Sequence, residues 1–431
     1  MLPRVGVVYT RKSELSLEYK QLAQYIALCL AASGRCAKTW LIGAAKHDKY
    51  KGSDKSKSDT DALALRCDGV VLDSSKISAD TFEATVDLKT LHECDLWLLM
   101  VEADETLKVA EYLHKMFGNS CENRPKRVVL SIQTTMRRLA QLNIALPEAI
   151  VVHGGAAFHV VKDDRGLLRP LSRGCFFVER LSKEKSSAVY ALDLLESTGI
   201  RVLCRHNIQA MKWGCTMLRT FYYINALTGK SVIDGLRDRK TRFLFLQVLV
   251  EMDELFQIVA SAATVNKSKS GRVSIPDTSA ATLFPVQSLM VLLPLPDWIF
   301  NSFVIKAFDL GLVVPSSDYK SVMTSDLMAC PPLQTNFEAE LRDVFELAAG
   351  RSMTLPALEK LQQTFSSAKM RQQQEKKADS DSAYQVRIDS GVLLAAVKLS
   401  PNCTTASRTF FLKCFFTFVL TLLLALYLFV M

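Results

Sequence analysis

The sequence contains no C-x-x-C pair, although it has eleven cysteines. Cys29, Cys94 and Cys175 are typical of the set, which lies scattered through apolar segments. An odd number without paired spacing excludes a disulfide framework and indicates reduced, mostly buried thiols. His153 and His159 lie near a Gly-Gly pair but have no cysteine or carboxylate at metal-ligand spacing, so we expect no structural metal.

A secretory signal is also missing, because the first four residues precede five β-type residues instead of a long apolar run. The other end is different. Cys414 to Met431 contains no charge in eighteen residues, and Thr409 to Leu412 extend it beyond Lys413. Since roughly 20 apolar residues cross a bilayer, we predict a transmembrane helix over 409–431, with a buried core helix as the alternative.

The predicted membrane segment implies a single-pass C-terminal tail anchor with the preceding chain in the cytosol. Arg408 and Lys413 would then lie on the cytosolic side. The sequence leaves open the mitochondrial outer membrane, the endoplasmic reticulum and the peroxisome. The net charge of +9 is modest for 431 residues and is mixed with acidic residues, so we expect no nucleic-acid partner.

The first turn has no glycine. VGVVY (Val5 to Tyr9) reads as a strand and is followed by a helical pattern, which is how a dinucleotide-binding domain begins. Such a domain uses small residues in the turn, so that backbone N–H groups approach the phosphates. Here the turn reads Thr10 to Glu14, TRKSE, which is bulky and charged.

Continuous apolar runs predict the strands of a parallel sheet buried on both faces. Between the first two runs, a helical pattern ends at Ser33-Gly34, a good C-cap. The predicted strands are Val5–Tyr9, Thr39–Ile42, Leu96–Val101, Arg127–Ile132 and Ala149–Val152. Asp164-Arg165-Gly166 reads as a hairpin tip.

The pattern of apolar and polar residues changes twice along the chain. From His206 to about Thr364 the pattern is mainly helical, and residues 366–382 are polar, as in a solvated linker or a helical stalk. We therefore predict an α/β Rossmann-like domain over 1–205 and an all-α domain over 206–365. A linker over 366–408 and the membrane segment over 409–431 follow.

The second predicted domain begins with a run of spaced motif residues. These are Trp213, Asn225-Ala226-Leu227-Thr228-Gly229, Leu236, Asp238, Arg242 and then Glu251 or Glu254. The order resembles the C-terminal domain of the ketopantoate reductase family, which runs W-x-K-L-x-x-N, N-A-L-(S/T)-G, L-x-D-x-x-x-R and then an E-containing helix.

Other stretches resemble the same family in the same order. CDLWLLMVEADET (Cys94 to Thr106) resembles D-L-v-l-v-x-v-K-x-x-x-T, and SIQTTMRRL (Ser131 to Leu139) resembles s-l-Q-N-G-v-x-N. YKSVMTSDL (Tyr319 to Leu327) resembles S-S-M-x-x-D-L, and TNFEAELRDVFELA (Thr335 to Ala348) resembles T-E-I-D-x-L-N-G-x-v-v-x-L-A. The resemblance spans about Val5 to Thr364. It implies a 6-phosphogluconate-dehydrogenase-like pair of domains, with the active site between them and NADP(H) as cofactor.

The catalytic positions depart from the family pattern. The lysine that acts on the substrate ketone is Cys215 here, and a thiol carries no positive charge to stabilise a developing alkoxide. The asparagine four residues later is Arg219. One serine of S-S-M remains as Ser321, and the glutamate of T-E-I-D is Asn336.

The cofactor positions also depart from it. Thr10, Arg11 and Lys12 stand in place of the glycine turn, and Thr134 stands in place of the Q-N-G asparagine. No carboxylate follows TWLIG to hold a ribose 2′-hydroxyl, so NAD is not expected, whereas Lys46 would face the 2′-phosphate of NADP(H). A solvated basic turn explains the same lysines and arginine.

Three readings of function stay open. The first is a divergent ketopantoate-reductase-like protein, catalytically impaired, that serves as a membrane-bound binding or scaffold module. The second is an active NADPH-dependent reductase of 2-dehydropantoate or another 2-oxo acid. The third is another enzyme class that uses Cys215 or His153. The sequence leaves open a protein partner, a homodimer and the absence of any cofactor.

Overall fold

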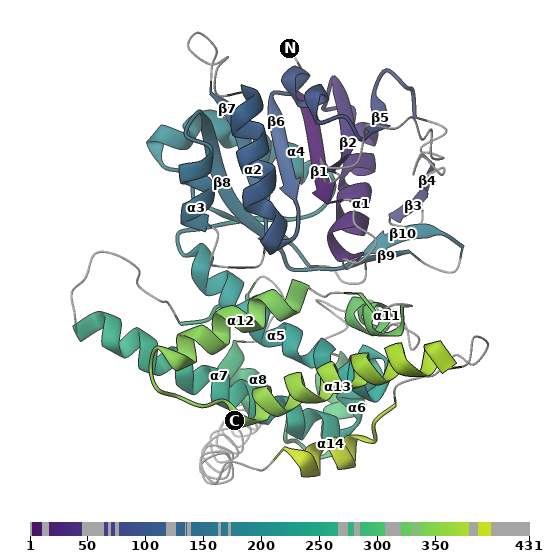
Figure 1. Cartoon of the computed structure of the whole chain (residues 1–431), viewed down its shortest axis with the longest axis vertical. Coiled ribbons are helices and arrows are strands. Elements are labelled where there is room, and N and C mark those ends of the chain that lie inside the picture. Colours follow the sequence, from purple (N-terminus) through teal and green to yellow (C-terminus); the bar gives the residue numbers. More distant parts are fainter. Residues whose placement is uncertain are drawn as a thin grey trace, which may run out of the picture.

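The computed structural model describes residues 2–10, 17–44, 64–67, 70–73, 77–117, 126–133, 135, 139–162, 165–170, 174–265, 275–279, 285–306, 320–329, 332–333, 336–378 and 387–397. A sheet-bearing half carries the N-terminus and a helical half lies against it (Figure 1). The predicted arrangement, a parallel sheet followed by helices, is confirmed.

The main sheet has eight strands in the order β12-β11-β8-β7-β6-β1-β2-β5. All its neighbouring pairs run parallel except β8 and β11, which are antiparallel. Its strands are β1 (Arg4–Thr10), β2 (Lys38–Ala44), β5 (Phe82–Thr85), β6 (Leu96–Met100), β7 (Arg127–Ile132), β8 (Ala149–Ala156), β11 (Phe176–Glu179) and β12 (Val202–Arg205). The five predicted strands are all present, and β8 continues past its predicted end at Val152 to Ala156.

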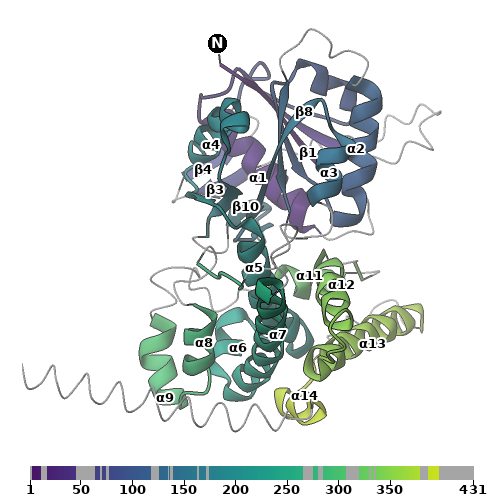
Figure 2. The same cartoon turned by 90° about the vertical axis from the view of Figure 1, so that its left-hand side faces the viewer.

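Helices cover both faces of this sheet (Figure 2), which is why its strands are apolar on both sides. Val7 packs with α1 (Glu18–Ala32) and α4 (Val189–Glu196), whereas Val8 packs with α2 (Ala103–Phe117) and α3 (Leu139–Ala145). Helix α1 ends at Ala32, with Ser33 as its C-cap and Gly34 at φ +66°, as predicted.

A second sheet of four strands, in the order β4-β3-β10-β9, lies beside the first. The antiparallel pair β9 and β10 forms the predicted hairpin, and Gly166 takes φ +78° in its turn. The strands are β3 (Ala64–Cys67), β4 (Val70–Asp73), β9 (Val160–Lys162) and β10 (Leu167–Pro170). The described part of this half also contains the 3₁₀ helices η2 (Leu88–Glu93) and η4 (Lys183–Ala188).

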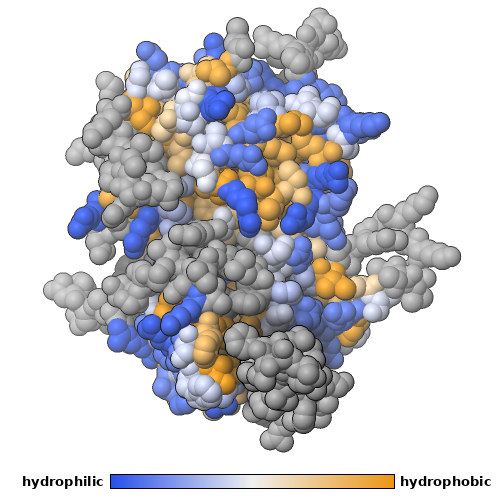
Figure 3. All heavy atoms as spheres, turned by 180° about the vertical axis from the view of Figure 1, so that it is seen from behind, coloured by the Kyte–Doolittle hydropathy of each residue, from blue (hydrophilic) through white to orange (hydrophobic). Residues whose placement is uncertain are grey.

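The helical half is built around α5 (Ile208–Thr228) and α7 (Arg239–Val265), whose apolar faces form one large core with their neighbours. The other helices are α6 (Val232–Arg237), α8 (Val286–Leu292), α9 (Asp297–Ile299), the π-helical η5 (Phe300–Val304), α11 (Val322–Met328), α12 (Asn336–Ala349), α13 (Pro356–Ala378) and α14 (Ser390–Ala396). Seen from behind, hydrophilic residues in blue surround hydrophobic areas in orange (Figure 3).

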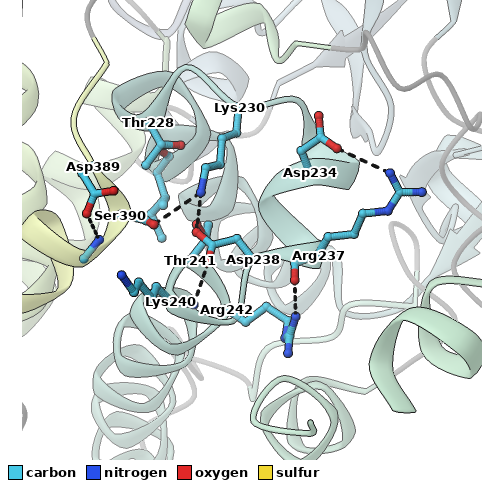
Figure 4. A network of polar contacts seen from close by, with 12 residues as sticks. Thr228, Lys230, Asp234, Arg237, Asp238, Lys240, Thr241, Arg242, Asp389 and Ser390 are labelled. Atoms are coloured by element: carbon cyan, nitrogen blue, oxygen red, sulfur yellow. Dashed lines mark hydrogen bonds and ion pairs between the residues drawn. The ribbon is translucent and has the colours of Figure 1, made fainter. Parts of the chain in front are cut away.

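The motif residues of this half hold helices together. Gly229 ends α5 in the left-handed conformation at φ +66°. Asp238 accepts hydrogen bonds from Lys230 and from Thr241, the latter at 2.7 Å (Figure 4). Arg242 is fully buried and donates to the carbonyl oxygens of Leu236, Arg237, Leu293 and Leu295. These residues therefore have structural roles in the helical half.

Within residues 366–408, for which the sequence predicts a solvated linker or a helical stalk, two segments are helical. Residues 366–378 are the second half of α13, and α14 packs against α7. Leu393 and Val397 belong to the helical core, and the Ile388 N–H donates to the Leu227 carbonyl oxygen at 3.0 Å. The helical half thus extends past its predicted end at residue 365.

The predicted membrane segment, residues 409–431, lies outside the described residues. Within the described part of the chain, no helix has the length and apolar character needed to cross a bilayer.

Candidate functional site

The carboxyl edge of the main sheet faces α5, at the junction between the two halves (Figure 2). Ligands of open α/β folds bind at this edge of the sheet. Thr10 ends β1, Glu102 follows β6, and Gln133 follows β7. Gln133 ties two of these segments together, because its amide donates to the Val101 carbonyl oxygen at 3.1 Å and to the Thr106 hydroxyl.

A buried ion-pair network crosses this junction at Arg219 of α5. Its guanidinium donates to both carboxylate oxygens of Glu18 in α1, at 2.7 and 2.8 Å. Its Nε lies 3.4 Å from Oε2 of Glu340 in α12. The three side chains are 6%, 12% and 1% exposed. The pair is bidentate, a geometry that the planar guanidinium of arginine favours.

The neighbouring groups keep both members of this pair charged. Burial by itself raises the pKa of Glu18, but the positive charge of Arg219 and the His159 ring outweigh it, so the pKa lies well below its usual value. Burial lowers the pKa of Arg219, and the carboxylates of Glu18 and Glu340 outweigh that effect. His159 Nδ1 lies 3.3 Å from Glu18 Oε1, and its ring meets Tyr222 edge-on at 5.1 Å.

Cys215 lies one turn before Arg219 and is 3% exposed. It packs in an apolar cluster with Cys175, Phe177, Ile208 and Met211. Burial, followed by the nearby Cys175, raises its pKa far above the usual value for a thiol. Cys215 therefore supplies neither a thiolate nor a cation, and it acts as a small core residue.

Lys212 is a second cation that α5 brings to this junction, besides Arg219. It is fully buried, and its Nζ donates to the Thr135 carbonyl oxygen at 3.4 Å, just beyond β7. Burial lowers its pKa to about 7, against the opposing attraction of Glu340 and Glu179. Its amine is thus partly neutral near pH 7.

The other predicted catalytic residues have structural positions. Ser321 is the N-cap of α11; its hydroxyl accepts from the Thr324 N–H at 3.3 Å and donates to the Tyr222 carbonyl oxygen at 3.3 Å. Asn336 begins α12, and its side chain lies outside the described part of the structure.

Of the predicted cofactor residues, Thr10 is buried at the end of β1. Arg11, Lys12, Lys46 and Thr134 lie outside the described residues. The effect of the glycine-free turn on cofactor binding therefore stays a prediction from the sequence.

His153, the other candidate for new chemistry, is 5% exposed in β8. Burial, reinforced by Lys212 and Lys185, lowers its pKa to about 3, so the ring is neutral. Neither ring nitrogen has a hydrogen-bond partner within the described ranges, so nothing there orients the imidazole as a general base. Those ranges also contain no group of His, Cys, Asp and Glu that could hold a metal ion.

Glu102 puts an acidic group at this edge of the sheet. Burial raises its pKa to about 7, and the negative charges of Glu105 and Glu18 add to the effect. A dinucleotide pyrophosphate carries two negative charges, which favour backbone N–H groups and cations. Among the described residues at this edge, Glu18 and Glu102 are acidic, Arg219 is already paired with Glu18, and Lys212 is a buried amine. The turn between β1 and α1, residues 11–16, which would meet the pyrophosphate in a Rossmann domain, lies outside the described residues.

Sequence reasoning missed Glu18, Glu102 and Glu340. Two signals were available in the motif comparison, because Glu102 stands where the family pattern has lysine and Glu340 stands where it has leucine. The pairing of Glu18 with Arg219 joins residues 201 positions apart, and no local pattern marks it.

The sequence matches neither a protein-family profile nor a curated protein. Solved structures share its fold. D-mandelate dehydrogenase, in a complex with NADH and anilino(oxo)acetate, has a TM-score of 0.58 at 12% identity, over 85% of this chain and 98% of the other. A ketopantoate reductase of the PanE/ApbA family from Ralstonia eutropha has a TM-score of 0.56 at 16% identity, over 86% and 99%.

The 2-dehydropantoate 2-reductase of Geobacter metallireducens gives a TM-score of 0.54 at 12% identity, over 85% of this chain and 99% of the other. At these identities the likeness concerns the fold alone. The chain therefore has the fold of ketopantoate reductases and of D-mandelate dehydrogenase.

Proposed function

We propose that this protein keeps the ketopantoate reductase fold without its hydride-transfer chemistry and acts as a binding or scaffold module at a membrane. The buried pair between Arg219 and Glu18, with Glu340 behind it, carries this proposal. An incoming 2-oxo acid would have to displace the Glu18 carboxylate, which is already held in place by the chain. Removing one partner of such a pair costs about 3–5 kcal/mol.

The chemistry of the neighbouring positions supports the same proposal. Hydride transfer to a ketone develops an alkoxide, and preorganised donors or cations stabilise it. A buried thiol at Cys215 supplies only one weak donor, and Glu102 adds an acidic group at the sheet edge. The C-terminal segment 409–431 would hold the module at a membrane face.

Lys212 favours a second candidate, an NADPH-dependent 2-oxo acid reductase. Its Nζ lies 3.4 Å from the Thr135 carbonyl oxygen, and its pKa of about 7 suits proton transfer near neutral pH. In this candidate Lys212 would take the role of the family's catalytic lysine, whose place in this chain is occupied by Cys215. The ion pair would then have to open to admit substrate.

A turnover assay separates the two candidates. The full chain is purified in a neutral detergent and incubated with NADPH and ketopantoate, with the Geobacter metallireducens reductase assayed in parallel. We expect no oxidation of NADPH above the blank, and no rescue by Cys215→Lys, because Arg219 and Asn336 still differ from the family. Rapid turnover that Lys212→Met abolishes would establish the second candidate instead.

A further inference from the structure

A surface groove lies far along the chain from the junction, between α13 and the segment that leads into α14. Its volume is about 310 Å³, at the lower end of the range for small-molecule sites. It is lined by Lys360, Gln363, Thr364, Ser367, Ala368, Arg371, Arg387 and Ile388. No carboxylate is among these lining residues.

One face of α13 supplies most of this lining. Lys360, Thr364, Ser367 and Arg371 follow one another at intervals of four, three and four residues, which places them along one side of a helix. Arg387 approaches from the opposite wall. Three cationic side chains therefore converge on one concave surface.

These three cations have no ion-pair partner within the described ranges, unlike other basic residues nearby. Lys369, on the same helix, pairs with Glu338 at 2.8 Å. Two neighbouring carboxylates of the described ranges accept backbone hydrogen bonds: Glu359 from the Leu355 N–H at 3.4 Å, and Asp389 from the Gly391 N–H at 2.8 Å. The charge in the groove is thus left without a counterion from the described protein.

The two walls are fixed to the helical core. Phe365 and Ala368 of α13 are buried in it, as is Leu393 of α14. Ser390 accepts from Lys230 at 3.3 Å, which joins the Arg387 wall to the network in Figure 4. A rigid frame lowers the ordering cost of binding.

We propose that this groove binds a phosphate monoester, such as the headgroup of phosphatidic acid. The guanidinium groups of Arg371 and Arg387 and the ammonium of Lys360 suit a doubly charged phosphate. The Gln363 amide adds a neutral donor. The Thr364 and Ser367 hydroxyls donate to the Lys360 and Gln363 carbonyl oxygens, at 2.7 and 2.8 Å, so they shape the wall. A lipid source rests on the proposed membrane attachment, because the chain beyond Val397 leads to the apolar residues 409–431.

Calorimetric titration of the full chain in neutral detergent tests the proposal. The probes are short-chain phosphatidic acid, sodium phosphate and short-chain phosphatidylcholine. We expect phosphatidic acid to bind at least about tenfold more tightly than phosphate, because residues 409–431 would hold the protein in the same micelle as the lipid. We expect phosphatidylcholine not to bind. The double variant Arg371→Gln/Arg387→Gln should weaken phosphatidic acid binding by about tenfold or more.

The control variant Arg351→Gln/Lys183→Gln removes two exposed cations outside the groove and should bind like the parent protein. Binding of sodium phosphate as tightly as phosphatidic acid would overturn the lipid source. Absence of phosphatidic acid binding, or equal binding by both double variants, would overturn the site. Circular dichroism confirms that each variant is folded. None of these readouts involves NADPH, so they succeed or fail independently of the proposed loss of catalysis.

Discussion

At the position where the family resemblance leads one to expect asparagine, Arg219 brings a permanent charge into a buried junction. A charge in that place must be paired, because burying an isolated ion costs several kcal/mol. Glu18 and Glu340 provide the pairing from two other helices. Arg219 and Glu340, which differ from the family pattern, thus depend on each other and on Glu18 for the pairing of their charges.

Removing the guanidinium should strongly destabilise the fold. Arg219→Gln removes the guanidinium charge from the buried carboxylates of Glu18 and Glu340, and we expect the free energy of unfolding to fall by about 3–5 kcal/mol. Arg237→Gln is the matched control, since its pair with Asp234 is half exposed at 3.5 Å and should contribute less than about 1 kcal/mol. Urea unfolding measures both, and equal losses would contradict the buried-pair account.

His153 should make stability depend on pH. The pKa of His153 is about 3 in the folded chain, whereas its ordinary value is 6.5. Below pH 6.5, therefore, the unfolded chain binds a proton at this ring that the folded chain does not bind. Stability therefore falls as pH falls below 6.5, with a slope of about 1.4 kcal/mol per pH unit.

His153→Gln should lose this part of the slope. Glu102 and Glu251, whose pKa values are raised to about 7, act in the opposite direction, but they remain in both proteins and cancel in the comparison. Urea unfolding at several pH values between about 5 and 7 measures the difference. Parallel pH profiles would show that His153 is not held neutral.

At the scale of elements, Glu251 of α7 determines how α13 begins. Its carboxylate accepts from the Ala357 N–H at 2.8 and 3.0 Å and from the Leu358 N–H at 3.2 Å. The sequence left open whether Glu251 or Glu254 is the significant acid of this helix. The structure buries Glu251 and exposes Glu254, so Glu251 is the one that satisfies the first N–H groups of α13.

Removal of the Glu251 carboxylate, which caps α13, should lower the free energy of unfolding. Glu251→Ala should lower the free energy of unfolding by about 1–2 kcal/mol, whereas Glu254→Ala should change it by less than about 0.5 kcal/mol. Chemical denaturation at about pH 8, where Glu251 is mostly ionised, makes the comparison. An equal loss in the two variants would contradict the capping role.

Elements with strong local patterns could be predicted from sequence, and those set by tertiary contacts could not. The buried strands appear as apolar runs, and α1 has a glycine just beyond its end. For the second half of α13 the sequence leaves open a solvated linker or a helical stalk, because most of its residues are polar and Ala368 is one of the few that meet the core. The junction network escaped prediction because Glu18, Arg219 and Glu340 come together only through folding.

At the scale of the whole molecule, the proposed attachment to a membrane depends on residues 409–431. Deleting them should release the protein from membranes, while the full chain should remain in the pellet after carbonate extraction of cells. Replacing the segment with a known membrane anchor should restore pelleting and serves as the control. If the full chain and the truncated chain pellet equally, another part of the protein holds it at the membrane.

The central claim is that the junction holds an ion pair in place of a dinucleotide site. Calorimetric titration of the full chain with NADPH tests it most directly, with D-mandelate dehydrogenase and NADH as the positive control. We predict a Kd of about 1 mM or weaker, because carboxylates line the described part of the site. A Kd in the micromolar range would contradict the claim.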